Sequence, residues 1–158
     1  MSQNKWIERK TAHNYLANTL GGVIPKDAWG EISYFYNPGM VFNRGAYFAT
    51  IKEKNGDNDK ASNLDRPGVW RLNLGVSKGA YLEIFGPPPP RPGKGGVIEG
   101  NWDFTEKNTL TPHPIYGWMS WISILNPTEE MWAKCLPLID DAHSRARSNF
   151  EKRLRAKK

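Results

Sequence analysis

The feature that most constrains the fold is a strict alternation of side chains over residues 69–76. One side carries Trp70, Leu72, Leu74 and Val76, and the other carries Val69, Arg71, Asn73 and Gly75. A period of two residues is typical of a β-strand that buries one of its faces. We therefore expect a half-buried strand here, with its second face polar.

Three shorter runs of β-forming residues accompany this strand. Residues 32–36 end at the turn Asn37-Pro38-Gly39, residues 46–51 end in a polar cluster, and residues 120–125 follow later in the chain. Strands that are joined by short turns favour antiparallel pairing. The sequence therefore predicts an antiparallel sheet.

Apolar residues at helical spacing predict three helices around this sheet. The first covers residues 5–20, and a short central helix follows Ser77. A long C-terminal helix begins at Asn126, which can cap it, and at Pro127, which suits the first helical position. Pro137 lies inside this last helix and predicts a kink or a break.

Together these elements predict the α+β class, with the sheet packed by an N-terminal, a short central and a long C-terminal helix. We expect a single domain over residues 1–158, because this length suits one domain of ordinary size. A Pro/Gly-rich loop at 86–100 would be an insertion, and residues 145–158 would form a basic tail.

Composition excludes several classes of protein. Apolar residues make up 39% of the chain, which is enough for a packed core, and no apolar run is long enough to span a membrane. The first residues lack the apolar stretch of a secretory signal, so we expect a cytoplasmic protein. One cysteine, Cys135, excludes an internal disulfide framework.

The net charge of +6 belongs to the tail. Of 22 basic and 16 acidic residues, seven basic residues and Glu151 lie in 145–158, which leaves 15 of each sign in 1–144. The tail is therefore the candidate nucleic-acid site. A solvated helix end, which favours cations, is the plainer interpretation. The basic residues are Arg145, Arg147, Lys152, Arg153, Arg155, Lys157 and Lys158.

Local motifs give weak signals for catalysis. Residues 75–79 match the Gly-x-Ser-x-Gly pattern of a hydrolase nucleophile, between a strand and a helix, but Ser77 is also a typical helix cap. The three histidines lack the paired spacing of metal ligands. We favour the cap and expect no catalytic residue, no metal site and no cofactor.

Two segments that lead into strands are dense in polar and aromatic residues, namely residues 61–68 and 111–118. We expect them to meet at one edge of the sheet and to form a small-molecule site, with Arg66 paired to Asp65 and the His113 imidazole at the surface. The candidate ligand-binding residues are Asn63, Asp65, Arg66, His113, Tyr116, Trp118 and Trp121.

Several of these residues belong to motifs that resemble those of a known protein family. Residues 62–77 (SNLDRPGVWRLNLGVS), 102–105 and 112–117 (PHPIYG), with Trp121, resemble an uncharacterised bacterial family of unknown function. The layout is similar to that of MmcQ/YjbR-like proteins. Those are small α+β domains with a double-wing fold and a proposed DNA-binding role. The resemblance implies the fold and brings no established activity with it.

Two functional hypotheses follow. The first is a non-catalytic cytoplasmic binding domain for nucleic acid or another anionic ligand. The second is a small-molecule-binding protein or enzyme with its site near Asp65, Arg66 and His113. A deep pocket holding these three side chains would favour the second hypothesis, and a flat basic sheet face with Arg71, Lys78 and the tail aligned would favour the first.

Overall fold

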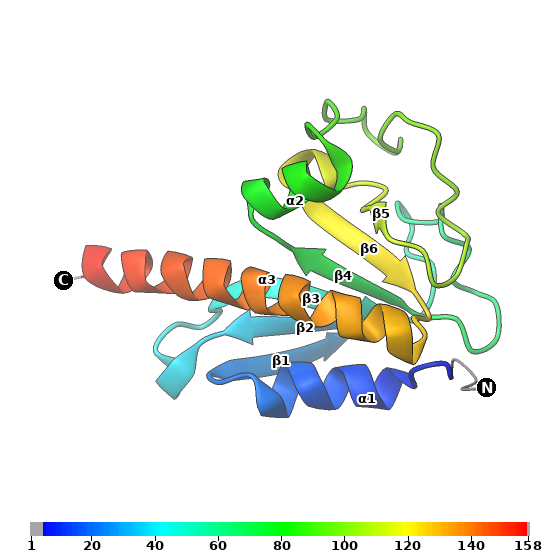
Figure 1. Cartoon of the computed structure of the whole chain (residues 1–158). Helices are drawn as coiled ribbons and strands as arrows, with labels where there is room; N and C mark the ends of the chain where they lie inside the picture. The colour runs from blue at the N-terminus through cyan, green and yellow to red at the C-terminus, as the bar shows by residue number, and fades with distance from the viewer. Residues whose placement is uncertain (1–4, 158) are drawn as a thin grey trace.

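The computed structural model describes residues 5–157 and contains a six-stranded antiparallel sheet in the order β1-β2-β3-β4-β6-β5 (Figure 1). The strands are β1 (Val23–Ala28), β2 (Glu31–Tyr36), β3 (Ala46–Lys52), β4 (Arg71–Gly75), β5 (Thr111–Pro112) and β6 (Trp121–Leu125). The helices are α1 (Arg9–Asn14), α2 (Lys78–Phe85) and α3 (Glu129–Ala156), with shorter helical turns η1 (Tyr15–Thr19), η2 (Pro38–Met40) and η3 (Gly117–Met119).

The predicted α+β class is confirmed, with the antiparallel sheet, the short central helix and the long C-terminal helix in the expected order. β1 was not predicted from the sequence. This strand contains Pro25 and lies at the edge of the sheet, where proline is tolerated because one side of the strand needs no partner. Its side chains are mostly exposed, so it lacks the apolar pattern that marks the other strands.

The apolar core lies on one face of the sheet, and α1 and α3 cross that face (Figure 1). Leu72 and Leu74 of β4 pair with apolar residues of β3 and β6, and the side chains of all three strands pack together in this core. The long helix contributes the buried residues Cys135, Ile139, Ala142, Ala146 and Phe150, at spacings of three and four. Burial raises the pKa of the Cys135 thiol to about 12, which keeps it protonated at neutral pH.

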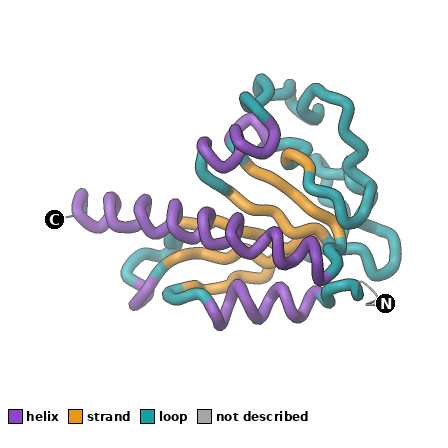
Figure 2. Tube along the Cα trace, in the orientation of Figure 1, coloured by secondary structure: helices purple, strands orange, loops and turns teal. Residues whose placement is uncertain are grey.

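The expectation of a half-buried β4 is wrong. Its five residues are all buried, because loops cover the polar face as the helices cover the apolar one. Figure 2 shows the long connections gathered beside β4, β6 and β5. Arg71 and Asn73, both fully buried, therefore lie in the interior and need partners there.

The long helix also differs from its prediction. Thr128, not Asn126, caps α3, and its side chain accepts a hydrogen bond from the Met131 amide. Asn126 instead connects the end of β6 to the segment before β4. Its side chain accepts a hydrogen bond from the Trp70 amide and donates one to the Gly68 carbonyl. Pro137 is exposed and does not end α3, which continues to Ala156. Packing of the apolar stripe against the sheet offsets the lost backbone hydrogen bond.

Ser77 caps α2, as predicted. Its hydroxyl accepts a hydrogen bond from the Ala80 amide and donates one to Asp141 of α3. Residues 86–110 form no regular helix or strand, and the interpretation of residues 86–100 as an insertion stays a prediction. None of the helices in residues 5–157 combines the length and the apolar character that a membrane crossing requires.

Candidate functional site

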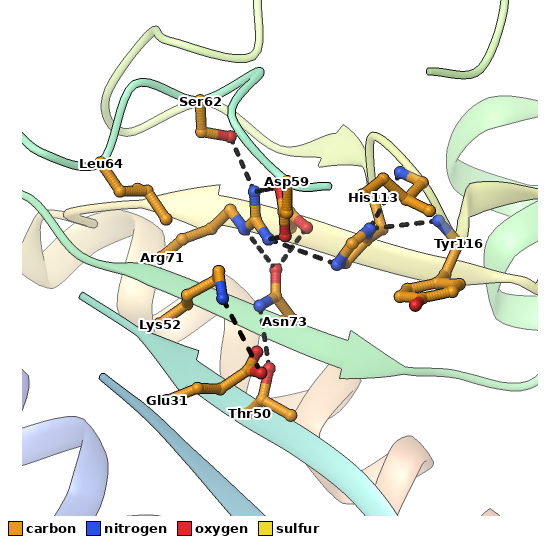
Figure 3. Close-up of polar contacts among 12 residues, drawn as sticks. Glu31, Thr50, Lys52, Asp59, Ser62, Leu64, Arg71, Asn73, His113 and Tyr116 are labelled. Carbon is orange, nitrogen blue, oxygen red and sulfur yellow. Dashed lines mark hydrogen bonds and ion pairs between the residues drawn. The ribbon is translucent and has the colours of Figure 1, made fainter. Parts of the chain in front are cut away.

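A buried polar network on the loop-covered face of the sheet has Arg71 at its centre (Figure 3). The guanidinium forms a bidentate ion pair with Asp59, through Nη1 to Oδ1 at 3.0 Å and Nη2 to Oδ2. Nη1 also donates to the Ser62 hydroxyl at 2.9 Å, and Nε donates to Oδ1 of Asn73 at 2.8 Å. Arg71 thereby connects β4 to the β3–β4 loop, which carries Asp59 and Ser62.

The network continues across the sheet through Asn73. Its Oδ1 accepts from Arg71 and from the Ser123 hydroxyl at 2.6 Å, so its amide nitrogen must face the opposite way. That nitrogen donates to Oγ1 of Thr50 at 2.9 Å. Thr50 is thus fixed as an acceptor, and no acceptor among the described residues takes its hydroxyl proton. The proton is available to a ligand.

His113 completes the network from the segment that precedes β6. Its Nδ1 accepts hydrogen bonds from the backbone amides of Ile115 and Tyr116, each at 3.1 Å. Because Nδ1 is an acceptor, a neutral imidazole carries its proton on Nε2. Nε2 lies 3.4 Å from Nη2 of Arg71, which is also a donor. Two donors therefore face one another, and an acceptor that lay beside the pair, within hydrogen-bond distance of both nitrogens, would satisfy both.

Burial and charge set the protonation states in this network. His113 is 4% exposed, and burial, together with the Arg71 charge, lowers the pKa of its imidazole well below the usual value. Burial alone would raise the pKa of Asp59, but the hydrogen bonds and charge of Arg71 outweigh it and lower that pKa. At neutral pH the network therefore holds a charged Arg71–Asp59 pair and a neutral His113.

A cleft of about 290 Å³ opens beside this network. Thr50 and His113 present the donors described above. Aromatic walls come from four residues of four different segments, and charged groups lie at Glu31 and Arg44. Phe35 and Tyr47 pack with ring centroids 5.7 Å apart, and Tyr47 and Trp121 with centroids 5.0 Å apart. The fourth aromatic residue is Tyr116, which packs against His113.

A β-bulge brings Tyr47 into the cleft. Tyr34 pairs with Ala49 and Phe35 pairs with Tyr47, so Phe48 is the extra residue between them. Phe48 is fully buried and packs in the core against His143, with ring centroids 5.4 Å apart. Tyr47 consequently faces the cleft, where a regular strand would have turned it to the core.

Gly75 makes room for Trp121 on the same face. The two residues are paired between β4 and β6, and the indole ring lies over the glycine. A Cβ atom on Gly75 would lie 2.7 Å from two atoms of that ring, closer than atoms can pack. The absence of a side chain at this position lets Trp121 reach across to Tyr47.

Gly75→Ala is therefore expected to displace Trp121 and to lower the free energy of unfolding by about 1–3 kcal/mol, the usual cost of overpacking. Gly79→Ala is the matched control, because nothing lies within 4 Å of a Cβ atom there and the residue is in α2. The control should gain up to about 1 kcal/mol from helix propensity. Chemical denaturation of both variants tests this, and equal effects would contradict the role of Gly75.

Comparison with known proteins places the chain in a family. A family model described as Family of unknown function (DUF6194) matches residues 7–155. The chain belongs to DUF6194. The match extends from before α1 to the penultimate residue of α3, so it includes the whole sheet. The predicted resemblance to an uncharacterised family is thus confirmed, whereas the similarity to MmcQ/YjbR-like proteins stays a prediction. No curated protein and no solved structure matches the chain.

This DUF6194 member brings three of the seven predicted ligand-binding residues together. His113, Tyr116 and Trp121 line the cleft. Trp118 lies in a neighbouring pocket, where the Arg91 guanidinium stacks 4.9 Å above its ring. The imidazole of His113 was expected at the surface, and that expectation is wrong because the ring is buried.

Asn63, Asp65 and Arg66 do not join His113. Asp65 accepts a hydrogen bond from the Asn55 amide, and Arg66 donates to the carbonyls of Ser62, Asn63 and Thr105. The expected pairing of Arg66 with Asp65 is replaced by these backbone contacts. Both side chains line a different, more open cavity of about 630 Å³.

The two predicted segments nevertheless do meet through other residues. Ser62 and His113 both contact Arg71, so residues 61–68 and 111–118 approach each other over the face of β4. The prediction placed this meeting at an edge of the sheet and assigned it to Asp65 and Arg66. A buried arginine that needs several acceptors explains why the segments converge on the face of the sheet instead.

The basic tail of this DUF6194 member is the end of α3. Arg145 donates to the Val76 carbonyl at 3.4 Å, Arg147 pairs with Glu151 at 3.5 Å, and Arg153 donates to the Arg44 carbonyl at 3.0 Å. Lys157 lies 5.3 Å from the Phe42 ring centroid. Lys152 and Arg155 are exposed, and Lys158 lies outside the described residues.

The buried network was not predicted from the sequence as a set; its members are Thr50, Asp59, Ser62, Arg71 and Asn73. One signal was present, because Arg71 and Asn73 interrupt a strand that is otherwise apolar. Their partners come from other segments, and no local pattern connects them. Within residues 5–157, no group of three or more His, Cys, Asp or Glu side chains is placed to hold a metal ion.

Proposed function

We propose that this protein binds a small molecule in the cleft between β2, β3, β6 and His113, and that the ligand presents a hydrogen-bond acceptor to His113 and Thr50. The observation that carries the proposal is the orientation of His113. Two backbone amides occupy Nδ1, so the remaining nitrogen, Nε2, is a buried donor without an acceptor among the described residues.

The second donor supports the same ligand chemistry. Asn73 donates to Thr50, so the Thr50 hydroxyl proton is directed elsewhere, and Thr50 lines the same cleft as His113. Buried donors that lack acceptors cost free energy until a ligand or water satisfies them. A carbonyl, carboxylate or phosphate oxygen would meet this need.

The walls and size of the cleft favour a small planar body. Tyr47 and Trp121 present aromatic surface, and a volume of about 290 Å³ lies near the lower limit for small-molecule sites. Arg71 is fully buried and paired, so it is not part of a flat basic face for nucleic acid. This geometry favours the small-molecule hypothesis, with the site moved from Asp65 and Arg66 to the sheet face.

The test compares benzamide, which has an aromatic ring and an acceptor, with toluene, which has the ring alone. Benzamide should bind more tightly, as measured by NMR titration. His113→Asn preserves an acceptor for the Ile115 and Tyr116 amides and removes Nε2, and Thr50→Val removes the hydroxyl. Each should weaken benzamide binding by about 3- to 10-fold, the value of one hydrogen bond, and should leave toluene unaffected.

Thr11→Val on the exposed side of α1 is the control and should bind benzamide as the wild type does. Equal affinities for benzamide and toluene would contradict the proposal. A second result would also contradict the proposal. Neither aromatic probe would bind, and the protein would instead bind single-stranded DNA tightly and in a salt-dependent way that disappears when residues 151–158 are removed. That result would assign the function to the tail instead.

A further inference from the structure

One cation of the cleft has no partner. Arg44 lines the cleft with His113 and Trp121, and its guanidinium forms no ion pair or hydrogen bond within residues 5–157. The other charged group of the cleft, Glu31, lies 3.9 Å from Lys52. An arginine at the mouth of an aromatic cleft, next to two uncharged donors, is suited to a carboxylate or phosphate.

The loop that carries Arg44 is held in one conformation. Asn37 closes it with two side-chain hydrogen bonds, donating to the Phe42 carbonyl at 2.8 Å and accepting from the Phe42 amide at 3.2 Å. Gly45 packs so closely on the Tyr36 carbonyl that a Cβ atom would lie 2.0 Å from its oxygen. The backbone on both sides of Arg44 is therefore fixed relative to β2.

The end of α3 contacts the same loop. Arg153 donates from Nη1 to the Arg44 carbonyl at 3.0 Å, and its guanidinium lies 4.1 Å from the Phe42 ring centroid. Phe42 in turn packs edge-on against Phe150, which is buried under Tyr36. In Figure 1, α3 passes beside the connection between β2 and β3, and its last turns project beyond the sheet. The basic tail thus touches the residue that borders the cleft.

We propose that the cleft takes an aromatic anion, with Arg44 as its counter-ion, and that Arg153 is a positioning residue that holds Arg44 at the mouth. This inference rests on the proposed function and specifies the charge of its ligand. It also gives the C-terminal end of α3 a role that is distinct from general attraction of polyanions, because Arg153 donates a hydrogen bond to the Arg44 carbonyl.

The experiment measures dissociation constants for benzoate, phenyl phosphate and benzamide by NMR titration at low salt. Wild type should bind the two anions more tightly than benzamide. Arg44→Gln should weaken the binding of both anions by about 3- to 10-fold, as expected for a partly exposed charged hydrogen bond. It should change the dissociation constant of benzamide by less than about twofold. The ratio of the two dissociation constants shows whether the cleft prefers a carboxylate or a phosphate.

Arg153→Gln and Arg155→Gln form a matched pair, because each removes one positive charge from the tail and Arg155 is exposed without a contact in the described residues. Arg153→Gln should reduce the preference for anions over benzamide and speed hydrogen exchange of the Phe42 amide. Arg155→Gln should do neither. Equal effects of the two variants, or no preference for anions in wild type, would overturn the inference.

These outcomes separate the two proposals. If benzamide binds and responds to His113→Asn, but anions gain nothing from Arg44, the inference fails and the proposed function stands. If benzamide binding does not respond to His113 or Thr50, the proposed function fails, and the ligand role of Arg44 fails with it.

Discussion

Arg71→Met is expected to lower the free energy of unfolding by about 3–5 kcal/mol, the usual cost of removing one partner from a buried ion pair. The variant leaves the Asp59 carboxylate buried without its bidentate partner. It also takes one donor from Asn73 and one from Ser62. Because domains are stable by only about 5–15 kcal/mol, this single change should bring the protein close to unfolding, as measured by urea denaturation.

The pH dependence of this variant distinguishes loss of the ion pair from simple loss of packing. Without Arg71, burial raises the pKa of Asp59, so protonation should restore part of the stability as the pH falls. Arg71→Met combined with Asp59→Asn should likewise recover part of the loss at neutral pH. Arg147→Met, which breaks the exposed pair with Glu151, should change stability by less than about 1 kcal/mol. A similar loss in both arginine variants would contradict the central role of Arg71.

Mild acid should destabilise the wild-type protein through His113. The pKa of the folded imidazole lies well below 6.5, so between these two values the unfolded chain binds a proton that the native state does not. The free energy of unfolding should therefore fall as the pH drops below about 6.5, by up to about 1.4 kcal/mol per pH unit from this group. The same direction applies to Asp59, whose lowered pKa adds a further loss below about pH 4.

His113→Asn isolates the contribution of the imidazole. The variant keeps His13 and His143, so the difference between its stability curve and that of wild type reports His113 alone. Its curve should be flatter as the pH falls below about 6.5, the unperturbed histidine pKa. Below about pH 4 both proteins should lose stability together through Asp59. Parallel curves below about pH 6.5 would show that the pKa of His113 is not lowered in the folded protein.

The sequence by itself determined the fold class and most of the elements. The alternation over residues 69–76 located β4, and the apolar stripe of residues 131–150 located α3, because each pattern is local and has the period of its element. Ser77 was identified as a cap for the same reason, since its partner is the Ala80 amide three residues away. Thr128 was not predicted as the cap of α3, because Asn126 followed by Pro127 is an equally good local signal for a helix start. Only the contacts of Asn126 with Gly68 and Trp70 show that Asn126 is not the cap.

Only the tertiary structure decided the site. His113, Tyr116 and Trp121 were recognised because strand-leading segments rich in aromatic and polar residues are typical of binding sites. The other residues that line the cleft come from β2, β3 and the loop between them. Arg71 is charged in a position that alternation assigns to a polar face, and the sequence contains nothing that tells a solvated face from one covered by loops. The difference depends on long-range contacts: the β3–β4 loop supplies Asp59 and Ser62, and the segment before β6 supplies His113. A buried charge must find its partners in three dimensions, so its surroundings are fixed by the fold and not by neighbours in the chain.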